Sequence, residues 1–145
     1  HAATTGDRSH AATTGYRAHA ATTGCGSHAA TTGYGSHAAT TGDWSHAATT
    51  GDWSHAATTG DWSHAATTGD RAHAATTGSK AHAVCVGIGG RVKIGANGYG
   101  MLTWNDGARD RTVTIYEGED GVEAGVWYEL RDGKPIRCDD EENAA

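Results

Sequence analysis

A nine-residue repeat fills the first half of the chain and limits what the chain can fold into. The ten histidines recur every nine residues from His1 to His82, and nine copies read His-Ala-Ala-Thr-Thr-Gly before two variable residues and a Ser or Ala. Nine residues make two and a half helical turns, so successive repeats of a helix would face opposite sides, and Thr-Thr-Gly disfavours a helix in every copy. The repeat therefore predicts a short strand followed by a turn, with Gly at the corner.

The composition of the repeats excludes an ordinary hydrophobic core there. Residues 1–81 contain no Val, Ile, Leu, Met or Phe, and the methyl groups of Ala and Thr bury little apolar area each. Side chains alternate along a strand, so Ser45, Ala47 and Thr49 share one face and His46 lies on the other. We assign the small-residue face to the interior, which must then be thin, and expect the His-Ala-Thr face to point outward or toward another chain.

Two repeats are needed to close one coil, because nine residues are too few for a closed turn with useful strands. Equivalent residues 18 positions apart would then stack about 4.8 Å from each other. The sequence predicts an all-β chain: a parallel β-solenoid, or β-roll, of nine-residue repeats with about two repeats per coil, followed by a small β-meander domain. The expected divisions are a solenoid over 1–81, a degenerate repeat and Gly-rich transition over 82–100, a β capping domain over 101–138 and an acidic disordered tail over 139–145.

The capping domain is read as a meander with strands at 101–104, 111–117 and 126–131. Turns are expected at 105–107, 118–121 and 132–135. Its expected core consists of Leu102, Trp104, Val113, Ile115, Val126, Tyr128, Leu130 and Ile136. Such a domain would hide the last open edge of the solenoid, although it could instead be a receptor-binding tip carried by the solenoid.

Two resemblances follow from short motifs. The run from Gly42 to Ala47, of the form G-x-x-S-x-A, resembles the head repeat of trimeric autotransporter adhesins, although that repeat is longer and its second Gly corresponds to Thr49 here. Those heads are left-handed parallel β-rolls, so this resemblance implies a trimeric roll. The chain also resembles phage and prophage proteins with Ala-Thr-Gly nonapeptides and a short C-terminal β domain. The segment from Gly125 to Lys134 is similar to the W-Y-x-L-x-x-G segment that closes those proteins. This second resemblance implies a viral origin.

Several classes of protein are excluded by composition. No run of 18 apolar residues exists, so no transmembrane helix or membrane insertion is expected. A net charge of −6 argues against a simple basic nucleic-acid binder. Each repeat offers one Asp at most, which is too few oxygen ligands for a calcium-binding roll. The three cysteines, unevenly spaced, do not make a disulfide framework and fit folding in a reducing cytoplasm.

No catalytic residues or cofactors are expected. Ser45 and His46 are neighbours on one strand, so they point to opposite faces and cannot form a nucleophile–base pair. No metal site is expected either, because no Cys or carboxylate accompanies each His, and duplication alone explains the histidine column. Imidazoles about 4.8 Å apart could nevertheless share a transition metal. Protonation of the column should loosen the roll below about pH 5.5.

The variable pair in each turn is the expected contact surface. The candidate ligand-binding residues are Tyr16, Tyr34, Trp44, Trp53, Trp62, Asp43, Asp52 and Asp61. Exposed aromatic rings beside carboxylates can bind sugar rings or aromatic ligands. The alternative is that they shield strand edges and pack between subunits. Trp44 and Trp62, 18 residues apart, should stack on one edge, and Trp53 should lie on the other.

These features together favour a non-enzymatic structural and binding segment of a phage fibre or surface appendage. The expected assembly is a homotrimer with a carbohydrate or host-protein ligand, placed on a virion or cell surface after folding in the cytoplasm. One alternative is a protein of the host cytoplasm that binds a host factor or small ligand, such as an antagonist of host defence. Another is an ice-binding or adhesive repeat protein, since columns of Thr can order water.

Overall fold

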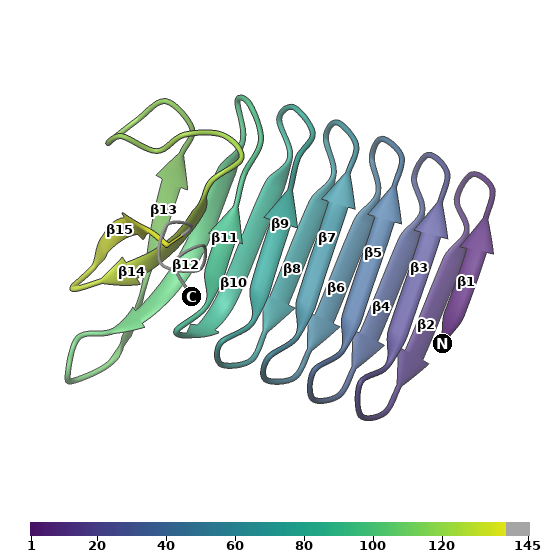
Figure 1. Cartoon of the computed structure of the whole chain (residues 1–145), viewed down its shortest axis with the longest axis horizontal. Coiled ribbons are helices and arrows are strands. Elements are labelled where there is room, and N and C mark those ends of the chain that lie inside the picture. Colours follow the sequence, from purple (N-terminus) through teal and green to yellow (C-terminus); the bar gives the residue numbers. More distant parts are fainter. Residues whose placement is uncertain (139–145) are drawn as a thin grey trace.

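The computed structural model describes residues 1–138, which form strands and turns and contain no helix (Figure 1). The described residues accordingly include no helix able to cross a membrane. The expected tail, 139–145, lies outside the described residues. The strands of the repeats are β1 (Ala2–Thr5), β2 (His10–Thr14), β3 (His19–Thr23), β4 (His28–Thr32), β5 (His37–Thr41), β6 (His46–Thr50), β7 (His55–Thr59), β8 (His64–Thr68) and β9 (His73–Thr76). After them come β10 (His82–Ile88), β11 (Arg91–Lys93), β12 (Tyr99–Asn105), β13 (Asp110–Tyr116), β14 (Trp127–Arg131) and β15 (Lys134–Arg137).

The strands form a parallel β-solenoid, which confirms the predicted fold class. Odd-numbered strands β1 to β11 build one sheet and even-numbered strands β2 to β10 build the other. Within a sheet, each residue pairs with the residue 18 positions along, as His46 does with His64. One coil therefore holds two repeats, and the coils stack along the long axis of the molecule with their turns on two opposite edges (Figure 1).

The predicted division of each strand into an inner and an outer face is confirmed. Ser45, Ala47 and Thr49 are at most 2% exposed, and the His46 ring points outward. Because only Ala, Ser and Thr point inward in the repeats, the two sheets can lie close together along this part of the solenoid.

Glycine opens the turn for a reason beyond conformational freedom. Gly42 has a φ of 128°, and a Cβ there would lie 2.3 Å from the carbonyl oxygen of Gly24 in the preceding coil. Two residues later the chain is again left-handed, with φ values of 62° at Trp44 and Trp53. A non-glycine residue pays about 1–2 kcal/mol for that conformation, so the turn places its bulky side chains at a local energetic cost.

The C-terminal strands continue the two sheets of the solenoid. Strand β12 pairs with β10 in parallel and with β13 in antiparallel fashion, and β14 pairs antiparallel with both β11 and β15. The strands expected at 101–104, 111–117 and 126–131 are therefore present, but β13 and β14 belong to different sheets. The turn expected at 132–135 is only two residues long, since Asp132 and Gly133 both have positive φ, and β15 begins directly after it.

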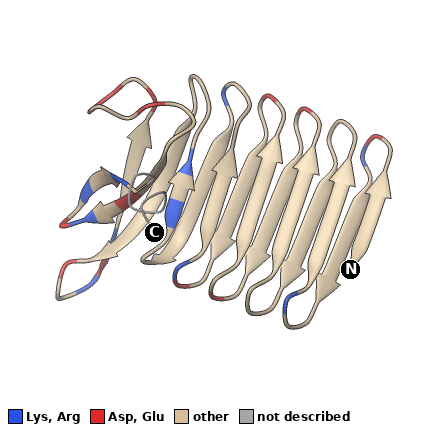
Figure 2. Ribbon diagram, viewed as in Figure 1, with Lys and Arg blue, Asp and Glu red and all other residues tan. Residues whose placement is uncertain are grey.

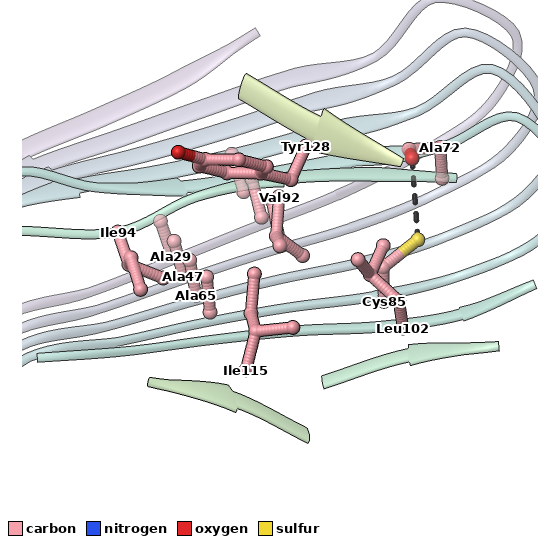
Figure 3. Close-up of a cluster of buried hydrophobic side chains, with 14 of the residues drawn as sticks. Ala29, Ala47, Ala65, Ala72, Cys85, Val92, Ile94, Leu102, Ile115 and Tyr128 are labelled. Carbon is pink, nitrogen blue, oxygen red and sulfur yellow. Dashed lines mark hydrogen bonds between the residues drawn. The ribbon is translucent and has the colours of Figure 1, made fainter. Parts of the chain in front are cut away.

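Large apolar side chains enter the interior only at this end. Val92, Ile94 and Leu102 are almost completely buried and pack in one cluster with the alanine row of the repeats. Figure 3 shows this row of alanines leading to Ile94, Val92 and Leu102. Of the expected core, Leu102, Ile115 and Tyr128 are buried, whereas Trp104, Val113, Val126, Leu130 and Ile136 are only partly buried. The C-terminal core is thus an extension of the solenoid core.

Candidate functional site: turn edges and the end of the solenoid

The eight candidate residues are divided between the two turn edges of the solenoid. One edge, called here the Trp44 edge, carries Asp43, Trp44, Asp61 and Trp62. The other, the Trp53 edge, carries Tyr16, Tyr34, Asp52 and Trp53. The split follows from the repeat, because successive turns alternate between edges.

Aromatic rings stack within each edge. The rings of Trp44 and Trp62 lie 5.4 Å apart and nearly parallel, as the 18-residue spacing predicts, and those of Tyr16 and Tyr34 lie 5.5 Å apart. Cations continue the rows: Lys80 Nζ lies 4.8 Å from the Trp62 ring centre. Stacked aromatic and cationic side chains thus line both edges.

Glycines interrupt both rows and leave one side of a tryptophan without a neighbouring side chain. In the turns that precede Trp44 and Trp53 on their own edges, the equivalent positions are Gly26 and Gly35. Trp44, with one stacked partner, is 57% exposed, and Trp62, between Trp44 and Lys80, is 43% exposed. Among the described residues, no aromatic ring or cation stacks on the indole face of Trp44 that points toward Gly26, and the side chain of Arg8 lies next to Gly26 in the preceding coil.

The aspartates of the turns have a structural role that the sequence reading missed. Asp52 Oδ1 accepts a hydrogen bond of 2.9 Å from the backbone N–H of Asp70, in the next coil of the same edge. Asp43 and Asp61 accept equivalent bonds from the N–H groups of Asp61 and Ser79. Each carboxylate therefore holds two coils together through one oxygen. The signal was present in the sequence, since Asp recurs at the same turn position 18 residues apart.

A cleft where the repeats give way to the C-terminal strands was not predicted. It has a volume of about 440 Å³ and is lined by Trp53, Arg71, His73, Gly89, Arg91 and Glu129. A second opening of similar volume lies on the turn side of Arg71, against Asp52, Asp70 and Ile88. The cleft exists because the repeat has decayed: Gly89 puts no side chain over Arg71, and Arg91 takes the place of the next histidine.

The chemistry of this junction cleft is mixed. The Arg71 guanidinium lies 5.2 Å from the Trp53 ring centre, and Arg91 Nε lies 3.6 Å from a Glu129 carboxylate oxygen. Burial, together with the charges of His55 and Arg91, lowers the pKa of His73 to about 4, so this ring is neutral at pH 7. An aromatic ring, guanidinium groups and carboxylates around one opening suit a polar ring-shaped ligand such as a sugar.

Histidine rings form a column on the outer face of each sheet. Consecutive rings along β2, β4, β6 and β8 are parallel, with centres 4.7–4.9 Å apart. Strands β1 to β10 contain no charged Lys, Arg, Asp or Glu, and Figure 2 shows such residues only in the turns and toward the C-terminal end. Among residues 1–138, no group of three or more His, Cys, Asp or Glu side chains converges to hold a metal ion.

Serine and histidine do not meet within a strand. Ser45 is buried, with its hydroxyl donating to the Gly24 carbonyl, while His46 lies outside. Of the three cysteines, Cys25 is exposed in a turn, and Cys85 and Cys138 are buried. Comparison with protein-family models, with curated proteins and with solved structures yields no match.

Proposed function

We propose that this chain is a non-enzymatic structural and binding segment, the solenoid of a phage fibre or a similar surface appendage. The observation that carries this proposal is the repetition of one coil geometry with an interior of small side chains. Each added coil lengthens the solenoid without changing its cross-section, and the stack is held by backbone ladders and by turn contacts. Such a body suits a spacer that displays side chains at fixed intervals.

The ligand we propose for the two turn edges is carbohydrate. Indole rings with one open face, beside carboxylates and cations, offer a stacking surface and hydrogen-bonding groups for sugar rings. The test is a glycan array probed with the wild-type chain, Trp44→Ala and Asn97→Ala. Asn97 occupies the equivalent position in the last turn of the same edge, beyond Lys80, and has the same left-handed backbone, with a φ of 55°, so it is the matched control. Loss of binding in Trp44→Ala alone supports the proposal, and equal binding by all three proteins contradicts it.

The trimer we propose is tested by light scattering on a sizing column. A mass of three chains in an elongated particle supports the fibre segment. The double variant Trp44→Ala/Trp62→Ala then separates the two roles of the aromatic row. A trimer that persists but loses glycan binding assigns the row to the ligand, and dissociation to single chains assigns it to subunit packing.

A second candidate function is supported by the junction cleft. A compact monomer would favour a host-cytoplasmic protein that binds a small ligand or host factor through Trp53, Arg71 and their neighbours. Thermal hysteresis measured on the same sample tests the ice-binding alternative.

A further inference from the structure

The histidine column of the β2–β10 sheet changes geometry at its last pair. From His10 to His64 the rings are stacked face to face, with interplanar angles of 3–8°. Between His64 and His82 the angle is 78°, and the two Nδ1 atoms lie 3.2 Å apart. In this pair the Nδ1 atoms of the two rings face each other. In the rest of the column, neighbouring rings contact each other through their faces.

The ring of Tyr99 lies against His82 at the point where the geometry changes. In the next strand of the sheet, Tyr99 takes the place of the next histidine and pairs in register with His82. Its ring stacks on the His82 ring at a centre-to-centre distance of 3.9 Å. His82 is thus held against Tyr99 and turns its edge, with Nδ1, toward His64.

The distance between the two nitrogens matches that of a chelated metal ion. Zinc–nitrogen bonds are about 2.0–2.1 Å long, so two nitrogens bound to one tetrahedral zinc lie about 3.4 Å apart. In-plane lone pairs of parallel stacked rings point in the same direction and cannot converge, whereas those of crossed rings can. Burial and, for His64, the neighbouring His82 lower the pKa of both rings, so both are neutral at pH 7 and only one Nδ1 needs a proton for their hydrogen bond.

We propose that His64 and His82 form a two-histidine chelating site for a divalent transition-metal ion of the zinc, nickel or copper class. Neutral imidazole is a preferred ligand of these ions. Both rings would bind the ion through Nδ1 as neutral imidazoles. The ring that donates the hydrogen bond would change tautomer, its proton passing through solvent from Nδ1 to Nε2, and water would complete the coordination of the ion. The ion would also link β8 to β10, the last coils of this sheet before the C-terminal strands. The site is independent of the proposed fibre function and of the turn edges.

The experiment is a Zn²⁺ titration of the full chain, labelled with nitrogen-15, at pH 7.5. Long-range proton–nitrogen spectra distinguish Nδ1 from Nε2 and resolve the individual histidines. The first equivalent of Zn²⁺ should shift Nδ1 of His64 and His82. Shifts spread evenly over all the histidines, or confined to Nε2 atoms, would overturn the proposal.

Variants in the same column provide the matched comparison, with affinity measured by calorimetry. His82→Ala should weaken Zn²⁺ binding roughly tenfold or more, whereas His28→Ala, which removes a face-to-face rung, should leave the affinity unchanged. Tyr99→Leu keeps both ligands and should weaken binding, because the ring that orients His82 is gone. His82→Gln serves if His82→Ala does not fold. Equal affinity in the wild type and the position-82 variant contradicts the site, as does Mg²⁺ binding as tightly as Zn²⁺.

Discussion

The glycine that opens each turn adopts a positive φ, and in most coils it also leaves room for the backbone of the preceding coil. Gly15 and Gly42 allow these two roles to be tested separately. Gly15 and Gly42 have nearly the same φ, 125° and 128°, but only at Gly42 would a Cβ meet the preceding coil, 2.3 Å from the Gly24 oxygen. Gly15→Ala should lower the free energy of unfolding by about 1–3 kcal/mol through backbone strain. Gly42→Ala should cost about 1–3 kcal/mol more, because the coils must shift. Urea unfolding of both variants measures the difference, and equal losses would show that the close approach costs nothing.

Two inward-facing hydroxyl groups, one just before β6 and one within it, should respond differently to removal. The Ser45 hydroxyl donates to the Gly24 carbonyl and accepts from the Ser27 N–H, at 3.1 and 3.3 Å. The buried Thr49 hydroxyl has no hydrogen-bond partner. Ser45→Ala should therefore lower the free energy of unfolding by about 1–3 kcal/mol, and Thr49→Val should leave it equal or raise it by about 1 kcal/mol. A loss on Thr49→Val comparable to that of Ser45→Ala would reveal an unrecognised partner.

At the scale of strands, the histidine columns make stability depend on pH. Burial lowers the pKa of six rings from the ordinary 6.5, namely His37, His46, His55, His64, His73 and His82. As the pH falls below about 6.5, the unfolded chain binds protons that the folded chain excludes. The free energy of unfolding should therefore fall with pH, and continue to fall to about pH 4, where His73 titrates in the folded chain.

Melting temperatures between pH 7.5 and 4 check this prediction. His73→Gln should flatten the dependence, because that ring is among the more buried of the columns. Thr32→Gln, at an exposed position of β4 with no titratable side chain, is the control and should leave the dependence close to that of the wild type. A melting temperature that does not change over this range would mean that protonation of the histidine columns does not destabilise the folded chain, and would contradict the prediction.

The repeated strands could be read from the sequence because every copy contains the same alternation. With only Ser or Ala before each histidine and Ala after it, the inner face was identified by size alone. The pairing of the C-terminal strands could not be derived in the same way. Two hairpins can pair with each other or extend existing sheets, and the choice depends on how Val92, Ile94 and Leu102 fill the end of the solenoid.

The candidate sites were predictable to different degrees. The stacking of Trp44 on Trp62 follows from their 18-residue spacing. The junction cleft, in contrast, forms because Gly89 has no side chain and because the antiparallel pairing of β14 with β11 brings Glu129 close to Arg91. The crossed rings of His64 and His82 lie next to Tyr99, which follows His82 by 17 residues because the repeat has broken. Periodicity therefore predicts sites inside the repeats and fails where the repeats end.

At the scale of the whole molecule, stability should rise from the first coils toward the C-terminal end. The coils contact only their neighbours, so each depends on local interactions. Among residues 1–138, large apolar side chains are buried only from β11 to β14. Amide hydrogen exchange should be fastest in β1 and β2 and slowest in β8 to β11. Uniform protection along the solenoid would contradict this gradient and show that the molecule opens in a single cooperative step.

Leu102→Ala extends the same test. Truncating this buried side chain should cost about 2–5 kcal/mol. If stability is local, the loss of protection should be concentrated in β10 to β13, with β3 to β5 little changed. An equal loss in all strands would indicate one cooperative unit.

Residues 18 positions apart pair with each other, although the repeat is only nine residues long. Inserting an even number of repeats therefore has a different effect on the structure from inserting an odd number. Duplication of two nonapeptides lengthens the molecule by one coil and keeps every side chain upstream on its own edge. Duplication of a single nonapeptide moves everything upstream of it to the opposite edge and the opposite sheet. One such event between Trp44 and Trp53 would stack Trp44 on Trp53 and separate it from Trp62. Slippage of a repetitive gene could thus rearrange the displayed surface without a single amino-acid substitution.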